Sequence, residues 1–312
     1  KFFFEGNEAA ALGSIYGGIQ LLAWYPITPS SSMCEGIISY IPRLRTDDEG
    51  NATVAVIQAE DELAAAGMVL GAGWAGGRGL TATSGPGISL MQEFIGLAYF
   101  AEIPSVFWDV VRVGPSTGLP TRTQQSDIAM LYEGSHGDTQ HIVLLPGTVE
   151  ECFEFGWRAF DYSERFQTPV FGMSDLDLGM NRWACGGFTY PDKPMDRGKV
   201  VREKDVFEAF ETFGRYLDVD GDGIPYRTLP GSGMDPILYR GTGHNPMGAY
   251  SEKPEDYYNL MQRLRKKIDN ARDELPAPII REAEVCEVGI VFLGSMETVS
   301  YTHLRAHETH RY

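Results

Sequence analysis

Three acidic residues stand directly before a stretch of very small residues. Glu60, Asp61 and Glu62 precede residues 63–73, in which alanine and glycine predominate. Acids in the first turn of a helix complement the helix dipole, and this ordinary role explains most such clusters. A helix with so little side-chain bulk also lets another backbone or a ligand approach closely. A carboxylate at its start would lie in that contact, which makes the acids candidates for proton chemistry.

A second candidate is a hydroxyl group held in a proline-rich loop. Thr28 lies between Pro26 and Pro29 in the segment 25–32, and two prolines exclude regular strand pairing. The serines that follow can cap a helix starting near Met33. A loop of this kind can also present the Thr28 hydroxyl to a ligand in a fixed position. On the residues alone, both interpretations stay open.

Two further candidates follow predicted strands. Ser84 and Gly85 come after a strand over 80–84 and open a helix, so their backbone N–H groups could meet an anion. Arg112 closes the next strand, at the edge where open α/β sheets bind ligands. Its guanidinium suits a carboxylate partner, and a surface salt bridge is the alternative. Arg122 lies in the polar loop that follows.

An aspartate-rich turn lies far from these residues in the sequence. Asp218, Asp220 and Asp222 alternate with other residues before Gly223, which matches the first half of a calcium-binding loop. The acid expected at the twelfth position is missing, because Leu229 stands there. The turn is therefore a candidate for structural Ca²⁺ or Mg²⁺ binding, and a solvated turn is the alternative.

The elements expected around these residues alternate between strands and helices, which predicts an α/β fold with a mainly parallel sheet covered on both faces. The expected strands are 21–24, 53–58, 80–84, 105–111, 143–145 and 170–173, and the expected helices are 5–20, from 33 onward, 60–73, 88–100 and 149–162.

The alternation of strands and helices is lost after residue 183. We expect a main domain over 1–185, an irregular arm over 186–285, the truncated start of a second α/β domain over 286–298 and a non-native tail over 299–312. Within the arm, helices are expected near 205–216 and over 255–274. Within 286–298, the apolar run 288–293 predicts a strand.

Composition limits the function. The net charge of −17 argues against nonspecific nucleic-acid binding. No apolar run reaches the roughly 18 residues that a transmembrane helix needs, and no signal-peptide layout is present, so we expect a cytoplasmic protein that does not bind membranes. The cysteines at 34, 152, 185 and 286 are too widely spaced to form an iron–sulfur or zinc motif within this chain.

Three motifs together resemble one known family. They are Tyr25-Pro26-Ile27-Thr28-Pro29-Ser30-Ser31, the acidic small-residue helix, and Thr81-Ala82-Thr83-Ser84-Gly85-Pro86-Gly87. In this order and spacing they resemble the α subunit of 2-oxoglutarate (2-oxoacid):ferredoxin oxidoreductases, which are related to pyruvate:ferredoxin oxidoreductase. The resemblance covers roughly residues 5–298. It implies that residues 1–185 form a pyrimidine-binding domain for thiamine diphosphate.

The resemblance also implies residue roles. Glu62 matches the glutamate that hydrogen-bonds the aminopyrimidine ring and so helps to activate the cofactor, with Glu60 as the competing assignment. Thr28 and Arg112 match groups that contact the substrate, and Arg122 is a candidate for contact with substrate or a partner chain. The cofactor is expected to lie beside Pro26, Ser84 and Gly85.

The diphosphate end of the cofactor is expected on a separate β subunit. Gly221-Asp222-Gly223 and Asn245 have nearly the spacing of a diphosphate motif, but Pro246 follows where a second Asn is needed. We therefore expect Mg²⁺ and a [4Fe-4S] cluster on the β subunit. The family also uses CoA and ferredoxin, and many members carry a γ domain or subunit.

The expected reaction is oxidative decarboxylation of 2-oxoglutarate to succinyl-CoA, with electrons passed to ferredoxin. The same chemistry on pyruvate, a branched-chain or an aryl 2-oxoacid is the first alternative. A noncatalytic calcium-binding scaffold protein is the alternative from a different class, and it rests on the aspartate-rich turn.

Overall fold

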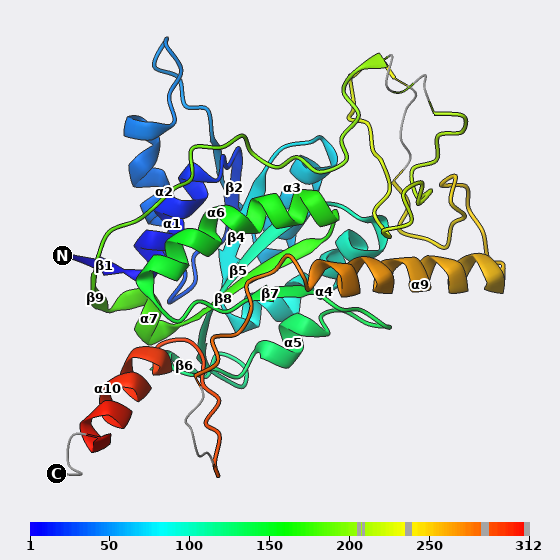
Figure 1. Ribbon diagram of the computed structural model, residues 1–312. Helices are drawn as coiled ribbons and strands as arrows, with labels where there is room; N and C mark the ends of the chain where they lie inside the picture. Colours follow the sequence, from blue (N-terminus) through cyan, green and yellow to red (C-terminus); the bar gives the residue numbers. More distant parts are fainter. Residues whose placement is uncertain (205–206, 208–209, 235–238, 282–286, 309–312) are drawn as a thin grey trace.

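The computed structural model describes residues 1–204, 207, 210–234, 239–281 and 287–308. Within them, the main sheet has seven strands, and six run parallel in the order β3-β2-β4-β5-β8-β7 (Figure 1). The parallel strands are β2 (Leu21–Trp24), β3 (Ala55–Gln58), β4 (Gly79–Thr83), β5 (Ser105–Val113), β7 (Ile142–Leu144) and β8 (Pro169–Asp175). The predicted α/β class with a mainly parallel sheet is confirmed.

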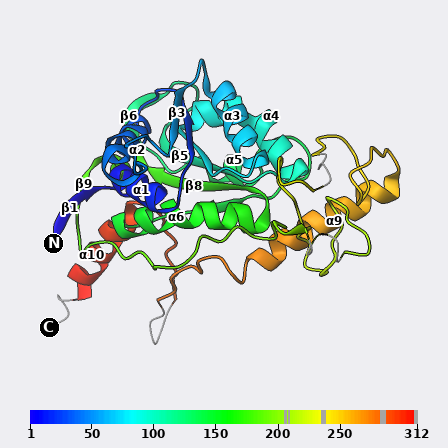
Figure 2. The ribbon, with the colours of Figure 1, turned by 90° about the horizontal axis from the view of Figure 1, so that it is seen from above.

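Helices cover both faces of this sheet (Figure 2). On one face, Trp108 and Val110 of β5 share a core with α1 (Gly6–Tyr16), α2 (Ser31–Leu44) and α6 (Val149–Phe166). On the other face, Phe107 and Val111 share a core with α3 (Glu62–Trp74), α4 (Gly85–Ala101) and α5 (Ile128–Tyr132). Because successive side chains of a strand point to opposite faces, β5 contributes to both cores.

The small residues of α1 are explained by its contact with α6. A Cβ atom at Gly13 would lie 2.1 Å from the carbonyl oxygen of Phe153, and one at Gly156 would lie 2.6 Å from the carbonyl oxygen of Ala10. Both distances are far below van der Waals contact. The two helix backbones therefore touch, and glycine is required at both crossing points.

Besides α5, four short elements were not predicted from the sequence. β1 (Phe2–Glu5) pairs antiparallel with β9 (Arg182–Cys185), and the short helix α7 (Leu176–Met180) precedes β9. β6 (Leu119–Thr123) pairs antiparallel with the end of β5, where the sequence predicted a loop. The helix predicted over 5–20 is shorter at both ends, because Glu5 belongs to β1 and Gly17 and Gly18 end the helix after Tyr16.

The arm is fixed to the main domain by a buried charge cluster. Helix α9 (Pro254–Ala271), which was predicted over 255–274, brings Arg263 and Lys267 to Glu102 at the end of α4. The Lys267 Nζ and the Arg263 Nη1 lie 2.9 and 3.0 Å from the Glu102 Oε2. Burial lowers the pKa of Lys267 to about 8. Part of the helix predicted near 205–216 falls outside the described residues, and residues 210–216 are not helical.

The strand predicted over 288–293 is not formed, and that prediction is wrong. A strand needs a neighbouring strand to satisfy its backbone, and none of the described strands pairs with this segment, where Val291 is 97% exposed. Residues 296–308 form α10 (Met296–Glu308), although no periodic structure was expected there. The domain boundaries at 185, 285 and 298 stay predictions. Within the described residues, no helix is long and apolar enough to cross a membrane.

The crossing of α1 and α6 gives a stability prediction. Gly13→Ala should lower the free energy of unfolding by about 1–3 kcal/mol, because the backbone of Phe153 cannot move away. Gly71→Ala in α3 is the matched control, since nothing lies within 4 Å of its added Cβ atom. This control should raise helix stability by up to about 1 kcal/mol. Urea unfolding of both variants of the full-length protein measures the difference, and equal effects would contradict the packing argument.

Candidate functional site

The three acids before α3 have three different environments. Asp61 is the N-cap of α3, and its Oδ1 accepts a hydrogen bond from the Ala64 N–H at 2.7 Å. Glu60 is exposed. Glu62, the first helical residue, is only 7% exposed, and none of the described residues forms a hydrogen bond or an ion pair with its carboxylate. The capping role therefore belongs to Asp61, and Glu62 is the buried acid without a partner.

The side chain of Glu62 packs against the first turn of α4. A Cβ atom at Gly87 would lie 2.8 Å from the Glu62 Cγ and 1.9 Å from the Thr83 Oγ1. Ser84 is the N-cap of α4, and Gly85 is the first residue of that helix. The predicted residues Glu62, Ser84 and Gly85 therefore gather where α3 and α4 begin.

Buried hydroxyl groups at this edge of the sheet lack partners. Ser84 and Thr81 are both 0% exposed, and the Oγ of Ser84 and the Oγ1 of Thr81 have no hydrogen-bond partner. Buried polar groups are normally hydrogen-bonded, so unpaired ones mark a place where a ligand can supply the missing partner. The residues present thus fit a polar heterocyclic ring that makes hydrogen bonds.

Thr28 and Arg112 are brought together over a long sequence separation. The Arg112 Nη1 donates to the carbonyl oxygen of Thr28 at 2.7 Å. Arg112 is 8% exposed and its Nε has no partner, whereas Thr28 and Pro26 are exposed in the loop. The loop is also a tight turn, because the Ile27 N–H donates to the Ser31 Oγ at 3.0 Å.

Arg122 does not join this pair. It lies exposed on β6, and its Nη1 donates to the carbonyl oxygen of its neighbour Thr121 at 2.9 Å. The register of β5 and β6 sets Arg112 opposite Thr123, so Arg122 is the residue next to that pairing. In this structure Arg122 is near the predicted site along the backbone, but its guanidinium contacts neither Thr28 nor Arg112.

The two groups of predicted residues approach the same sheet edge from opposite faces. Because side chains alternate along a strand, Arg112 lies on the same face of β5 as Trp108 and Val110, which belong to the core with α1 and α6. Glu62 lies on the other face, between α3 and α4. A ligand that lies across the carboxyl ends of β4 and β5 would therefore meet the acid from one face and the arginine from the other.

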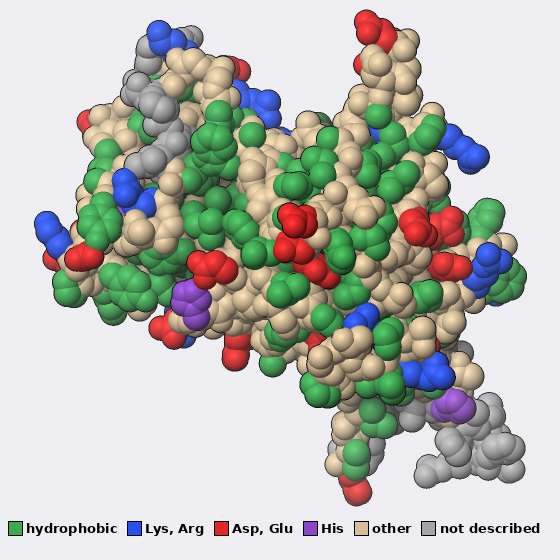
Figure 3. All heavy atoms as spheres, turned by 180° about the vertical axis from the view of Figure 1, so that it is seen from behind, with side chains coloured by type: hydrophobic (Ala, Val, Ile, Leu, Met, Phe, Trp, Pro, Cys, Tyr) green, Lys and Arg blue, Asp and Glu red, His purple; other side chains and the backbone are tan. Residues whose placement is uncertain are grey.

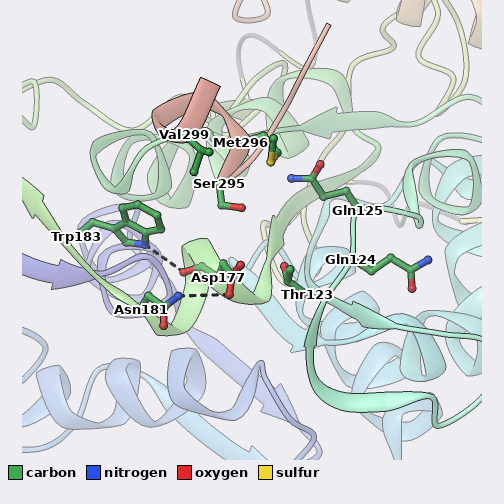
Figure 4. Close-up of a pocket in the computed structure, with 9 residues that line it drawn as sticks. All are labelled: Thr123, Gln124, Gln125, Asp177, Asn181, Trp183, Ser295, Met296 and Val299. Carbon is green, nitrogen blue, oxygen red and sulfur yellow. Dashed lines mark hydrogen bonds between the residues drawn. The ribbon is translucent and has the colours of Figure 1, made fainter. Parts of the chain in front are cut away.

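A separate hollow of about 300 Å³ opens beside this edge (Figure 4). It lies next to α7 and the start of α10, and the Trp183 Nε1 donates to the Asp177 carbonyl oxygen at 3.1 Å in its wall. Neither Glu62 nor Arg112 lines it. The lining residues are Thr123, Gln124, Gln125, Asp177, Asn181, Trp183, Ser295, Met296 and Val299.

Sequence reasoning missed one buried acid at the same edge. Asp109 lies in the middle of β5 and is 0% exposed, and no N–H or hydroxyl group of the described residues donates to its carboxylate oxygens. Burial and then the nearby Asp127 carboxylate raise the pKa of Asp109 well above its ordinary value. The signal in the sequence was an aspartate inside the otherwise apolar run Ser105–Val111.

The aspartate-rich turn surrounds a lysine. The Lys199 Nζ lies 2.6 Å from the Asp220 Oδ2 and 2.8 Å from the Asp222 Oδ2, and the Asp218 Oδ2 accepts from the Gly223 N–H at 2.9 Å. The ammonium group supplies the positive charge that a metal ion would bring. Among the described residues, no group of three or more His, Cys, Asp or Glu side chains is arranged to hold a metal ion. Metal binding at this turn stays a prediction without structural support.

Comparison with known proteins gives the same assignment as the motifs. Residues 12–182, more than half of the chain, match the family described as pyruvate flavodoxin/ferredoxin oxidoreductase, thiamine-diphosphate-binding. The chain is 40% identical over 277 residues to the 2-oxoglutarate synthase subunit KorA of Methanothermobacter thermautotrophicus, with 88% of this chain and 69% of that protein covered. It is 38% identical over 280 residues to the alpha subunit of 2-oxoacid:ferredoxin oxidoreductase 1 of Sulfurisphaera tokodaii, covering 88% of this chain and 44% of that protein.

A solved structure shares the fold. It is the 2-oxoglutarate:ferredoxin oxidoreductase of Magnetococcus marinus with 2-oxoglutarate, coenzyme A and succinyl-CoA bound, which matches with a TM-score of 0.81 and 31% identity. The match covers 91% of this chain and 47% of that one. The chain thus covers only part of the length of these three proteins, from 44% to 69%. It belongs to the pyruvate flavodoxin/ferredoxin oxidoreductase family, in its thiamine-diphosphate-binding part, as the three motifs predicted.

Proposed function

We propose that this chain works as the α subunit of a 2-oxoglutarate:ferredoxin oxidoreductase, which converts 2-oxoglutarate and CoA to succinyl-CoA and CO₂ and reduces ferredoxin. The observation that carries the proposal is the unpaired carboxylate of Glu62, a residue only 7% exposed at the start of α3, in a chain of this family. Relatives named for 2-oxoglutarate support the choice of substrate.

Glu62 would bind the pyrimidine end of thiamine diphosphate. The bound cofactor supplies the nucleophilic carbon and stabilises the carbanion. The Glu62 carboxyl, which has no competing partner, can carry a proton on one oxygen and donate it in a hydrogen bond to a ring nitrogen. The unpaired hydroxyl groups of Ser84 and Thr81 support a polar ring in this place, and Gly87 leaves room for it beside the glutamate.

Arg112 and Thr28 would orient the substrate. Arg112 keeps its Nε without a partner while Nη1 is used by the Thr28 carbonyl group, so part of the guanidinium fork remains for a carboxylate. The same bond fixes the loop that carries the Thr28 hydroxyl. Both carboxylates of 2-oxoglutarate are negative, and Arg112 is the cation that the described structure holds at this edge of the sheet next to Thr28.

The site is built to be completed by another chain. Apolar side chains are exposed around Glu62, with Leu63 at 40%, Met68 at 37% and Leu90 at 55%, and both Val56 and Ile57 of the edge strand β3 are exposed. Figure 3 shows hydrophobic side chains spread over this face of α3 and α4. An apolar face of this kind marks a protein interface. We propose that it binds the β subunit, which would bring Mg²⁺, the diphosphate site and the [4Fe-4S] cluster.

The other predictions from the sequence stay proposals. A γ domain or subunit, contact with ferredoxin and the substrate role of Arg122 rest on the family resemblance. A cytoplasmic location rests on the sequence pattern alone. Pyruvate, branched-chain and aryl 2-oxoacids remain the alternative substrates. The calcium-binding scaffold has no observation in its favour, because Lys199 already pairs with Asp220 and Asp222 of the aspartate-rich turn.

The assignment of Glu62 can be tested against its neighbour Glu60. In the full-length subunit purified with its β partner, Glu62→Gln should lower the rate of 2-oxoglutarate- and CoA-dependent viologen reduction by about 100-fold or more, because the amide cannot exchange a proton with the cofactor ring. Glu60→Gln should keep nearly the wild-type rate, since Glu60 is exposed. The reverse result would move the role to Glu60.

Arg112 and Arg122 can be separated by the same substitution. Arg112→Lys should raise the KM for 2-oxoglutarate by about 10-fold, because an ammonium cannot bind the Thr28 carbonyl group and a carboxylate in a planar fork. Arg122→Lys should change the KM by less than about twofold, since the exposed Arg122 guanidinium bonds its own neighbour. Steady-state kinetics of both variants decide which arginine binds substrate, and a larger effect at Arg122 would reverse the assignment.

The apolar face gives a prediction about assembly. Met68→Glu in α3 should raise the dissociation constant for the β subunit by about 10-fold or more, because the charge would be buried in the interface. Ile38→Glu in α2 is the matched control, since Ile38 is equally exposed, at 37%, on the opposite side of the sheet. Titration calorimetry with the separately purified β subunit measures both. Unchanged binding of Met68→Glu would rule out this face as the interface.

A further inference from the structure

A buried aspartate pair lies behind the first turn of α4. Asp109 points from β5 toward the face of α4, as Phe107 and Val111 do, and its register neighbours are Thr83 on β4 and Met173 on β8. It is 0% exposed, and both carboxylate oxygens lack a donor. An ionised carboxylate in such a place would strongly lower the stability of the fold, because neither water nor a cation would stabilise the charge.

The second aspartate comes from the loop before α5. The Oδ2 of Asp127 is buried without a donor, and its Oδ1 accepts from the Ser126 Oγ at 2.7 Å. Asp127 acts on Asp109 both through its charge and as a side-chain hydrogen-bond partner. Two carboxyl groups form a hydrogen bond with each other only when one of them holds a proton.

Among the described residues, no cation acts on Asp109. The pKa of Asp109 is raised by burial first and then by Asp127, and no lysine or arginine is among the groups that act on it. The other acids nearby come from neighbouring elements. Glu62 of α3 lies across the first turn of α4, and Asp175 of β8 accepts from the Gln125 Nε2 at 2.8 Å. Neither of these side chains carries a positive charge that could stabilise an ionised pair.

We propose that Asp109 and Asp127 share one proton and that this carboxyl pair is a positioning element for Glu62. The link is the first turn of α4, which is held between the two. A Cβ atom at Gly85 would lie 2.6 Å from the Asp127 Oδ2, and one at Gly87 would lie 2.8 Å from the Glu62 Cγ. The inference rests on the proposed function for the role of Glu62, but the shared proton itself does not.

Loss of the shared proton would act on the cofactor site through this turn. Two neighbouring negative charges with little water between them repel each other strongly. Asp127 would move away from Asp109, and the first turn of α4, which packs on Asp127, would move with it. Glu62 would then lose the surface against which its side chain rests, so cofactor binding should weaken as the pH rises through the raised pKa of Asp109.

Three variants of the full-length subunit, purified with its β partner, test this. Asp109→Asn keeps the shape and a donor for Asp127, whereas Asp109→Ala removes both. Asp48→Asn is the matched control, because Asp48 is exposed in a turn and is far from the pair in the sequence. Infrared difference spectra detect the protonated carboxylic acid. Kinetics between about pH 6 and 9 give the KM for thiamine diphosphate with Mg²⁺.

The expected results are specific to a shared proton. The wild-type minus Asp109→Asn spectrum at pH 7 should contain the carbonyl band of a protonated carboxylic acid, and the Asp48→Asn difference should not. Asp109→Ala should raise the KM for thiamine diphosphate by about 10-fold, whereas Asp109→Asn should stay within about twofold of wild type and should lose the wild-type rise in KM at high pH.

The contrary results differ for each part of the inference. Absence of the acid band at pH 7 would overturn the shared proton. A wild-type KM and pH profile in both Asp109 variants would overturn the positioning role, even with the band present. If the wild-type complex turned over no 2-oxoacid, the proposed function would fail instead. The spectra and a direct titration of thiamine diphosphate with Mg²⁺ would then still decide the proposal.

Discussion

The arrangement of the site depends on the contact between the first turn of α4, the end of β4 and the start of α3. At Gly87 a single added carbon would lie 1.9 Å from the Thr83 Oγ1 and 2.8 Å from the Glu62 Cγ. No side chain fits there, so the two helices can begin at the same sheet edge only with glycine at this position. The close approach buries Glu62, and it places Ser84 and Gly85 beside the glutamate.

Buried acids are paired with cations elsewhere in the molecule, but not at this edge of the sheet. Burial alone would raise the pKa of Glu102, yet Arg263 and Lys267 hold it well below its ordinary range. Arg78 is likewise paired, with its Nη2 2.8 Å from the Asp161 Oδ1. Among the described residues, neither Glu62 nor Asp109 has such a cation. An unpaired buried acid lowers stability, and such local costs are typical of places that bind ligands. The contrast separates the ion pairs that hold the arm from the acids of the site.

The fold was largely predictable from the sequence because its elements are encoded locally. Runs of apolar residues that alternate with amphipathic or small-residue segments indicated the six parallel strands and the long helices. The pairings of β1 with β9 and of β6 with β5 were missed. Each of these strands is short, and its partner is identified only by the tertiary structure. The helix at 296–308 and the missing strand at 288–293 show the same limit at the other end of the chain.

The candidate site was predictable only as separate residues. Glu62 could be chosen over Glu60 by resemblance, but its burial depends on α4, which follows more than twenty residues later. The bond between Arg112 and Thr28 joins residues 84 positions apart. The same holds for Lys199, which neutralises an aspartate-rich turn that the local sequence presented as a metal loop. Side-chain identity is local information, whereas the partner that satisfies a buried charge is not.

The separation of charges across the sheet edge suits the two ligands of the proposed reaction. Attraction and repulsion are strong at short range in a dry site, so an anionic dicarboxylate would avoid the face that holds Glu62, Asp109 and Asp127. That face suits the uncharged ring of the cofactor, which exchanges a proton with an acid. The opposite face presents Arg112 beside Thr28, where a carboxylate is attracted. Because β5 alternates its side chains, one strand supplies both the arginine and the buried aspartate, and the strand itself keeps the opposing charges apart.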